Sequence, residues 1–341
     1  MKMTSLRLLL LAAPLAVLSL AACSDDDSFS ASPDHRLAFS ADTVSLDTTF
    51  SRVPTTTRTF WVYNRSGDGL RCTSVRLRKG NQTGFRVNVD GMYLGQASGY
   101  QVGGVELRKD DSLRVFVELT SADTHSEVPE LLEDDLVFTL ESGVEQKVNL
   151  RAWSWDATLL DGLKIRSDTL IQSTKPIVVK GNIEVDSAAT LTIGAGTTLY
   201  FSNHAGIDVY GTLRAEGTPE ANVTLRGDRI DRMFDYLPYD RVSGQWQGIR
   251  LHASSFDNEI QYTDLHSAYN GIVCDSSAAD RTKLRLYNST VHNCQGYGLY
   301  AVGCQLDLYN TQVTNASIDC VSITGGSVVM RHCCLLYTSP S

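Results

Sequence analysis

One tripeptide recurs three times near the end of the chain, as Leu286-Tyr287-Asn288, Leu308-Tyr309-Asn310 and Met330-Arg331-His332, at a constant spacing of twenty-two residues. The surrounding residues keep this spacing, as in Leu284/Leu306/Val328, Val291/Val313 and Asn293/Asn315. A short, fixed period of β-prone residues is typical of stacked units that bury their apolar rows against their neighbours. Twenty-two residues is too short for a propeller blade of about 40–45 residues, and it fits one turn of a parallel β-helix.

Residues one period apart lie over one another in such a stack, because successive rungs are about 4.7–4.9 Å apart. We therefore predict inward apolar columns, Leu284/Leu306/Val328, Leu286/Leu308/Met330, Val291/Val313 and Ala301/Ile323. Asparagine tolerates left-handed backbone, so Asn288/Asn310 and Asn293/Asn315 are predicted at the corners of the rungs. On the outer face we predict an ion pair of Arg285 with Asp307 and a stack of the Tyr287 and Tyr309 rings.

The chain of 341 residues has room for a second domain before the β-helix. Residues 37–155 contain short segments of alternating polarity between turn-forming residues, at 43–47, 58–63, 73–77, 85–89, 113–118, 136–139 and 146–150. This pattern predicts a β-sandwich. The segments 39–44, 58–64 and 111–118 resemble the immunoglobulin-like modules of Bacteroidota surface lipoproteins, which implies a spacer or a weak protein-binding surface.

Residues 156–333 are predicted to form the β-helix. The stretch 190–201, followed by 211–218, resembles the opening turns of right-handed parallel β-helices of the pectate-lyase-like class. The resemblance implies an all-β chain in which an immunoglobulin-like sandwich precedes a right-handed parallel β-helix, a single-chain solenoid of about 22 residues per rung, and it says little about a reaction. Residues 334–341 match the translation of a sequencing adapter, which predicts a non-native tail, a break in the repeat and an incomplete β-helix.

Residues 1–22 have the organisation of a secretory signal, with Lys2 and Arg7 before an apolar run that is too short to span a membrane. Leu20-Ala21-Ala22-Cys23 resembles the bacterial lipobox, which implies that the Cys23 thiol is acylated and anchors the protein. Residues 23–36 are predicted to form an acidic tether. Its Ser24-Asp25-Asp26-Asp27 resembles the export signal of Bacteroidota lipoproteins, which implies the outer face of the outer membrane.

Two places offer side chains to a ligand. The irregular segment 227–245 is a long loop on a rigid scaffold, where binding residues often lie, and it contains Arg229, Arg232, Phe234, Tyr236 and Tyr239. It could bind a sugar or a protein, or it could be a flap packed over the stack through Phe234 and Leu237. Tyr287 and Tyr309 could offer a flat aromatic surface to an extended sugar, or could simply be cross-strand packing.

We predict no catalytic residues, no metal site and no cofactor. The carboxylates of the regular rungs, Asp264, Asp275, Asp280, Asp307 and Asp319, never recur at the period of the repeat, and His252, His266 and His292 share no register. The cysteines of the repeats lack ligand spacing, so they are predicted to pack as small hydrophobes. The net charge of −9 offers nothing to nucleic acid.

Together these features predict a lipid-anchored cell-surface protein, without enzymatic activity, whose β-helix presents a face to a polysaccharide or to a surface protein. The alternative is a polysaccharide lyase or glycoside hydrolase whose active residues lie in the 227–245 loop or on rungs beyond residue 333.

Overall fold

A computed structural model describes residues 28–234, 236–278 and 280–336. The predicted signal peptide, the predicted acylation site Cys23 and the start of the predicted acidic tether lie outside these residues. The described chain is all-β, with two short 3-10 helices, η1 (Gln96–Ser98) and η2 (Tyr239–Arg241). No helix within the described ranges has the length and apolarity that a membrane span requires.

The described chain forms two compact units, one of residues 28–44, 57–118 and 133–150, the other of residues 45–56, 119–132 and 151–336. Two sheets precede the β-helix. The first has the strand order β1 (Leu37–Phe39), β3 (Arg58–Asn64), β9 (Ser112–Leu119), β5 (Phe85–Val89) and β6 (Met92–Tyr93). The second has the order β2 (Thr43–Phe50), β11 (Glu145–Trp155), β10 (Glu130–Leu140), β4 (Leu70–Leu77) and β7 (Gln101–Val102), with β8 (Val105–Leu107) also on β4.

These two sheets pack as a sandwich. The pairs β1–β3, β3–β9 and β4–β10 run antiparallel. Phe39 and Phe138 meet across the sheets with ring centroids 5.2 Å apart, and Val62 and Val115 are fully buried. All seven strand segments predicted from the alternating pattern lie within observed strands.

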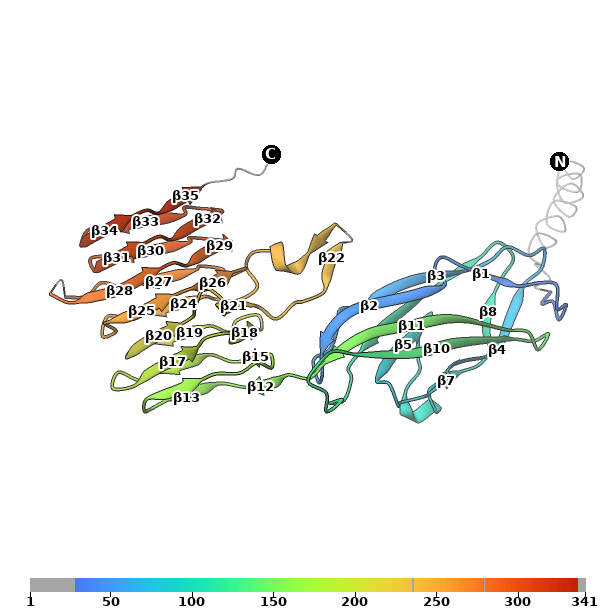
Figure 1. The fold of residues 1–341 in the computed structure, drawn as a ribbon. Helices are drawn as coiled ribbons and strands as arrows, with labels where there is room; N and C mark the ends of the chain where they lie inside the picture. Colours follow the sequence, from blue (N-terminus) through green and yellow to red (C-terminus); the bar gives the residue numbers. More distant parts are fainter. Residues whose placement is uncertain (1–27, 235, 279, 337–341) are drawn as a thin grey trace, which may run out of the picture. The chain divides into compact units, whose positions relative to one another are not determined.

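The second fold is a parallel β-helix of three sheets (Figure 1). The β12 sheet stacks β12 (Thr158–Leu160), β15 (Ile177–Val179), β18 (Thr198–Phe201), β21 (Val223–Gly227), β26 (Thr263–His266), β29 (Thr290–Cys294), β32 (Gln312–Ala316) and β35 (Cys334–Leu336). The β13 sheet stacks β13 (Leu163–Ile165), β16 (Ile183–Val185), β19 (Ile207–Val209), β24 (Ile249–Leu251), β27 (Ile272–Cys274), β30 (Leu299–Val302) and β33 (Val321–Thr324). The β14 sheet stacks β14 (Thr169–Ile171), β17 (Thr190–Gly194), β20 (Thr212–Glu216), β25 (Asn258–Gln261), β28 (Thr282–Tyr287), β31 (Gln305–Tyr309) and β34 (Ser327–Arg331).

The tripeptide repeat sets the register of the β14 sheet, as predicted. Leu286, Leu308 and Met330 are successive partners in β28, β31 and β34. Leu286 and Leu308 are fully buried, but Met330 is 37% exposed, because β34 has a neighbouring strand on one side only in the described stack. The four buried cysteines of the β-helix, Cys274, Cys294, Cys304 and Cys320, have free thiols and lie in the apolar core, as predicted.

The asparagine columns are also confirmed. Asn288 and Asn310 have φ of 48° and 49°, in the left-handed region, and Asn310 Nδ2 donates to Asn288 Oδ1 at 2.8 Å. Asn293 and Asn315 have φ of 53° and 55°, and their amides are hydrogen-bonded in the same way. The corners of the rungs therefore combine a backbone conformation that asparagine tolerates with a side-chain ladder.

The repeat does not break at Cys334, contrary to prediction. Gln312, Val313 and Thr314 pair with Cys334, Leu335 and Leu336, so β35 continues the register of the repeat. Residues 337–341 of the predicted tail lie outside the described residues.

Candidate functional site

A groove lies on the outer face of the β13 sheet. Asp208, Arg250, Val273 and Tyr300 are successive register partners in β19, β24, β27 and β30. Each is the middle residue of an Ile-x-Val or similar triplet whose outer members are buried, so alternation along the strand points these side chains outward. Four neighbouring rungs therefore contribute to one surface (Figure 1).

The groove has a volume of about 440 Å³. Its lining combines carboxylates, one guanidinium, amides and two tyrosine rings, from Asn182, Gly206, Ile207, Asp208, Gln247, Gly248, Ile249, Arg250, Asn270, Val273, Asp275, Tyr297 and Tyr300. A concave surface on which polar groups converge beside aromatic rings is a candidate ligand site.

The residue after each strand forms a second column at the edge of the groove, Tyr210, His252 and Asp275. The Tyr210 ring stacks on the imidazole of His252, with centroids 4.0 Å apart and planes 2° apart. His252 Nε2 lies 2.9 Å from Asp208 Oδ1, and Nδ1 lies 3.3 Å from Asp275 Oδ2. Both contacts are hydrogen bonds only when both ring nitrogens carry a proton. The side chains of three rungs are thus joined through one imidazole.

The remaining carboxylate oxygens of this cluster also accept hydrogen bonds. Asn182 Nδ2 donates to Asp208 Oδ2 at 2.8 Å. Arg250 donates through Nε and Nη2 to the two oxygens of Asp275, each at 3.2 Å. The hydrogen bond with Asp275 raises the pKa of Arg250, despite some burial of the guanidinium. The polar groups are therefore held in fixed positions before any ligand arrives.

Two tyrosines form the apolar part of the groove. The rings of Tyr297 and Tyr300 have centroids 4.9 Å apart and planes at 42°. Asn270 Oδ1 accepts from the backbone N–H of Tyr297 at 3.0 Å, which fixes the loop before β30. Flat aromatic faces beside fixed hydrogen-bonding groups suit a ligand with both apolar and hydroxylated surfaces.

The predicted loop 227–245 contains a hairpin of β22 (Arg232–Phe234) and β23 (Leu237–Pro238), followed by η2. Phe234 and Tyr236 are 52% and 78% exposed, and their rings stack with centroids 5.5 Å apart. Phe234 therefore does not pack over the stack as the flap alternative requires. The structure brings these two predicted residues together as an exposed aromatic pair.

Among the other predicted loop residues, Arg229 and Tyr239 contact each other. Arg229 Nη2 lies 2.6 Å from Asp231 Oδ2, and its guanidinium lies 3.8 Å from the centre of the Tyr239 ring. Hydrogen bonding to Asp231 outweighs burial and raises the pKa of Arg229. Arg232 is exposed at the start of β22. Arg229 and Tyr239 are thus engaged with their own neighbours.

The prediction that the Tyr287 and Tyr309 rings stack on each other is wrong. Tyr287 and Tyr309 are register partners, as expected. The Tyr287 hydroxyl, however, donates to Asp307 Oδ2 at 3.2 Å, and the Tyr309 ring meets His332 edge-on at 5.6 Å. Asp307 therefore has Tyr287 as its hydrogen-bond partner instead of the predicted ion pair with Arg285.

The groove was missed from the sequence because insertions hide its register. The register partners Asp208 and Arg250 are 42 residues apart, and Val273 and Tyr300 are 27 apart, so the fixed period of twenty-two residues does not align them. The prediction that the histidines share no register is wrong, since His266 and His292 are direct partners in β26 and β29. The detectable signal was the recurring triplet followed by a polar or aromatic residue, at 207–210, 249–252 and 272–275.

No family model matches the chain. Protein bark beetle of Drosophila melanogaster is 35% identical over 122 residues, which cover 35% of this chain and 4% of that protein. The chain thus spans a small fraction of that relative. A family 123 glycoside hydrolase from Clostridium perfringens matches with TM-score 0.25 and 7% identity, over 38% of this chain and 30% of that chain. The ASH/PapD-like domain 7 of human CEP192 matches with TM-score 0.23 and 10% identity, over 37% and 89%. These TM-scores carry no conclusion about fold or activity.

Proposed function

We propose that the protein is a cell-surface carbohydrate-binding protein and that the groove on the β13 sheet holds an extended glycan. The observation that carries this proposal is the pairing of the Tyr297 and Tyr300 rings with fixed carboxylate, guanidinium and amide groups in one groove that crosses four rungs. Sugar rings present a C–H face to an aromatic ring and hydroxyl groups to polar side chains. A groove that follows the stack suits a chain of such rings.

The charge of the groove favours a neutral glycan. Asp208 and Asp275 face one guanidinium, Arg250, which pairs with Asp275, so the groove has no excess of positive charge. On the two strands that precede β19 in this sheet, Lys164 of β13 and Glu184 of β16 form another ion pair, with Nζ 3.0 Å from Oε1. A surface without excess positive charge does not concentrate a polyanion such as a uronic-acid polymer.

Glycoside hydrolysis is the second candidate, because the site holds two carboxylates, and most glycosidases use a pair. Asp208 and Asp275 lie on opposite sides of one imidazole. All four of their oxygens accept hydrogen bonds from groups of the site, which leaves neither carboxyl group as a free proton donor. We therefore favour binding over cleavage.

The test uses the full chain, purified in detergent, on arrays of neutral and acidic polysaccharides, followed by calorimetry with the best ligand. We expect neutral glycans to bind, and Tyr300→Ala to weaken binding about tenfold, or about 1.4 kcal/mol. Tyr93→Ala, which removes a 54% exposed ring of β6, is the matched control and should bind as the wild type does. Exclusive binding of polyanions, or equal affinity of the Tyr300 variant, would refute the assignment. New reducing ends that disappear in His252→Ala would establish hydrolysis instead.

We also propose that acylated Cys23 holds the protein at the outer face of the outer membrane. The lipobox-like residues before Cys23 and the acidic residues after it support this location. Mass spectrometry of the mature N-terminus should detect a multiply acylated cysteine, and protease added to whole cells should cut the protein. A secreted form with an unmodified Cys23 would contradict the anchor.

A further inference from the structure

A second polar cluster lies on the β12 sheet, and none of its residues lines the groove. His266 and His292 are register partners in the adjacent strands β26 and β29, with ring centroids 4.8 Å apart and planes at 26°. Asp264 precedes His266 by two residues, so it points to the same outer side, while Leu265 between them is buried in the core. One carboxylate and two imidazoles therefore meet outside the sheet.

The donor atoms of this cluster already lie close together. Asp264 Oδ1 is 3.0 Å from His266 Nδ1 and 3.0 Å from His292 Nε2, and all three atoms lie within 4.8 Å of one another. Two nitrogens and one carboxylate oxygen are a common donor set for Zn²⁺ and related divalent ions. With bonds of about 2.0–2.2 Å, the donors of one ion lie about 3–3.5 Å apart. A modest rotation of the two rings would therefore complete the site.

A carboxylate also orients the more buried ring. His266 Nε2 lies 3.0 Å from Asp240 Oδ1, and Arg226 Nη1 lies 2.6 Å from that same oxygen. A histidine that binds a metal ion commonly donates its other N–H to a carboxylate, which selects the tautomer. With Nε2–H directed at Asp240, the Nδ1 lone pair of the neutral ring points toward Asp264 and His292.

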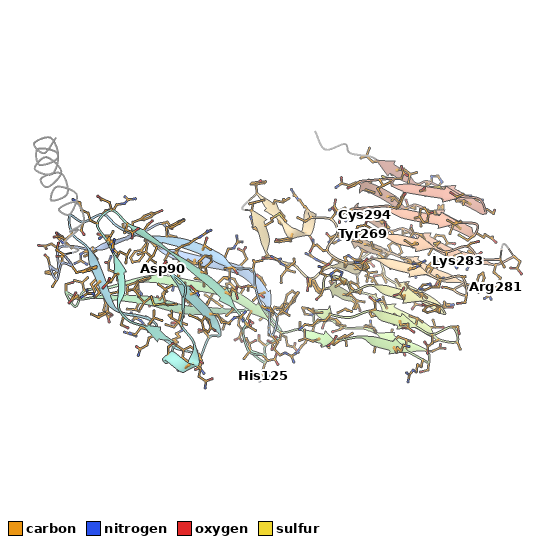
Figure 2. The ribbon with its side chains drawn as sticks, turned by 180° about the vertical axis from the view of Figure 1, so that it is seen from behind. Asp90, His125, Tyr269, Arg281, Lys283 and Cys294 are labelled. Atoms are coloured by element: carbon orange, nitrogen blue, oxygen red, sulfur yellow. The ribbon has the colours of Figure 1, made fainter. Side chains whose placement is uncertain are left out.

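The cluster also joins the inserted loop to the stack. Asp240 belongs to η2, and the loop returns beside β26, where the Gln245 N–H donates to the Ser267 carbonyl oxygen at 2.8 Å. Figure 2 labels two residues on this side of the β-helix: Tyr269, which follows β26, and Cys294, which ends β29. The side chains of Asp264 and His292 are 39% and 27% exposed, so water can reach an ion held there.

A proton on His266 would compete with a metal ion for this cluster. With both rings neutral, Asp240 and Asp264 against Arg226 leave one net negative charge, which attracts a cation. Burial lowers the pKa of His266, but its hydrogen bonds to Asp240 and Asp264 outweigh burial and raise it. A metal ion would replace this proton and would bind Asp264 and His292 directly, whereas a proton on His266 forms only hydrogen bonds.

We propose that Asp264, His266 and His292 bind one divalent transition-metal ion such as Zn²⁺, and that Asp240 positions His266 from the inserted loop. This site is separate from the glycan groove, so either assignment can fail without the other.

The test titrates the full chain, first stripped with a chelator, with CoCl₂ and with ZnCl₂. We expect one ion per chain, visible cobalt absorption bands, and at least tenfold weaker binding in His292→Ala and in Asp264→Asn. His204→Asn removes an exposed histidine outside the cluster and should leave binding unchanged. Equal binding in all variants would assign the ion to other surface histidines and overturn the proposal, as would failure to bind either metal.

A second measurement does not depend on the folding of any variant. Crystals of the unmodified protein, soaked in zinc, should give an anomalous peak between Asp264, His266 and His292. Absence of a peak there, or a peak elsewhere only, would also overturn the proposal.

Discussion

The asparagine corners provide the sharpest test of the β-helix, through two substitutions at one position. Asn310→Ala and Asn310→Gly both remove the amide that donates to Asn288 Oδ1 at 2.8 Å. They differ in the backbone, because residue 310 has φ of 49°, which glycine adopts without strain and alanine does not. The pair of variants therefore separates the side-chain ladder from the left-handed conformation.

The magnitudes follow from these two contributions to the free energy of unfolding. Loss of one hydrogen bond costs about 0.5–1.5 kcal/mol. Left-handed backbone costs alanine about 1 kcal/mol more. We expect Asn310→Ala to destabilise the β-helix by about 2 kcal/mol, and Asn310→Gly by about 1 kcal/mol, because the freedom of glycine in the unfolded chain partly offsets its relief of strain.

Urea unfolding of the full chain measures both effects, followed by circular dichroism and by fluorescence, because Trp246 is fully buried in the β-helix core. A difference of about 1 kcal/mol moves the midpoint by about 0.3–1 M when the urea dependence is about 1–3 kcal/mol per M. Alanine and glycine variants with equal midpoints would show that the left-handed corner does not limit stability. A stable alanine variant would refute the reasoning about both contributions.

Three further predictions concern a glycine of the groove, the apolar core of the β-helix and a buried lysine. Gly248→Ala should destabilise the protein by at least about 2 kcal/mol in thermal unfolding, because φ is +90° and a Cβ would lie 1.7 Å from a backbone carbonyl oxygen. Gly67→Ala is the control, because a Cβ at residue 67 meets only open space. Equal melting points of the two variants would contradict this prediction. Leu286→Ala should cost about 2–5 kcal/mol in urea and Met330→Ala far less, since the first is fully buried and the second 37% exposed; similar losses would show that the last rung is packed like the others. Burial lowers the pKa of Lys283, so wild-type stability should rise relative to Lys283→Met as pH increases from 7 to about 10, and parallel pH profiles in urea would exclude a buried lysine that loses its proton.

The architecture was predictable from the sequence where the period is uniform. The three tripeptides repeat at one constant interval, and the strands β28, β31 and β34 pair in that register. Asn288 and Asn310 were predictable as corners because asparagine tolerates left-handed backbone. Backbone register, buried columns and corner residues all follow from chain spacing and residue type.

The candidate site was not predictable in the same way, because it lies where rungs differ in length. Asp208 and Arg250 are partners although they are 42 residues apart, because the 227–245 loop intervenes between β19 and β24. A fixed period therefore places the relevant polar residues in different columns. Side-chain partners are also local choices, as for Tyr287, which donates to Asp307 instead of stacking on Tyr309.

The cluster centred on His252 has a consequence for how the stack comes apart. Between β21 and β24 the chain leaves the β-helix for the 227–245 insertion, so the chain connection between these two adjacent rungs is unusually long. Asp208, His252 and Asp275 tie three rungs side chain to side chain across this junction. Loss of this imidazole should therefore loosen the rungs on either side of β24, and amide hydrogen exchange in β24 should be slower in the wild type than in His252→Ala.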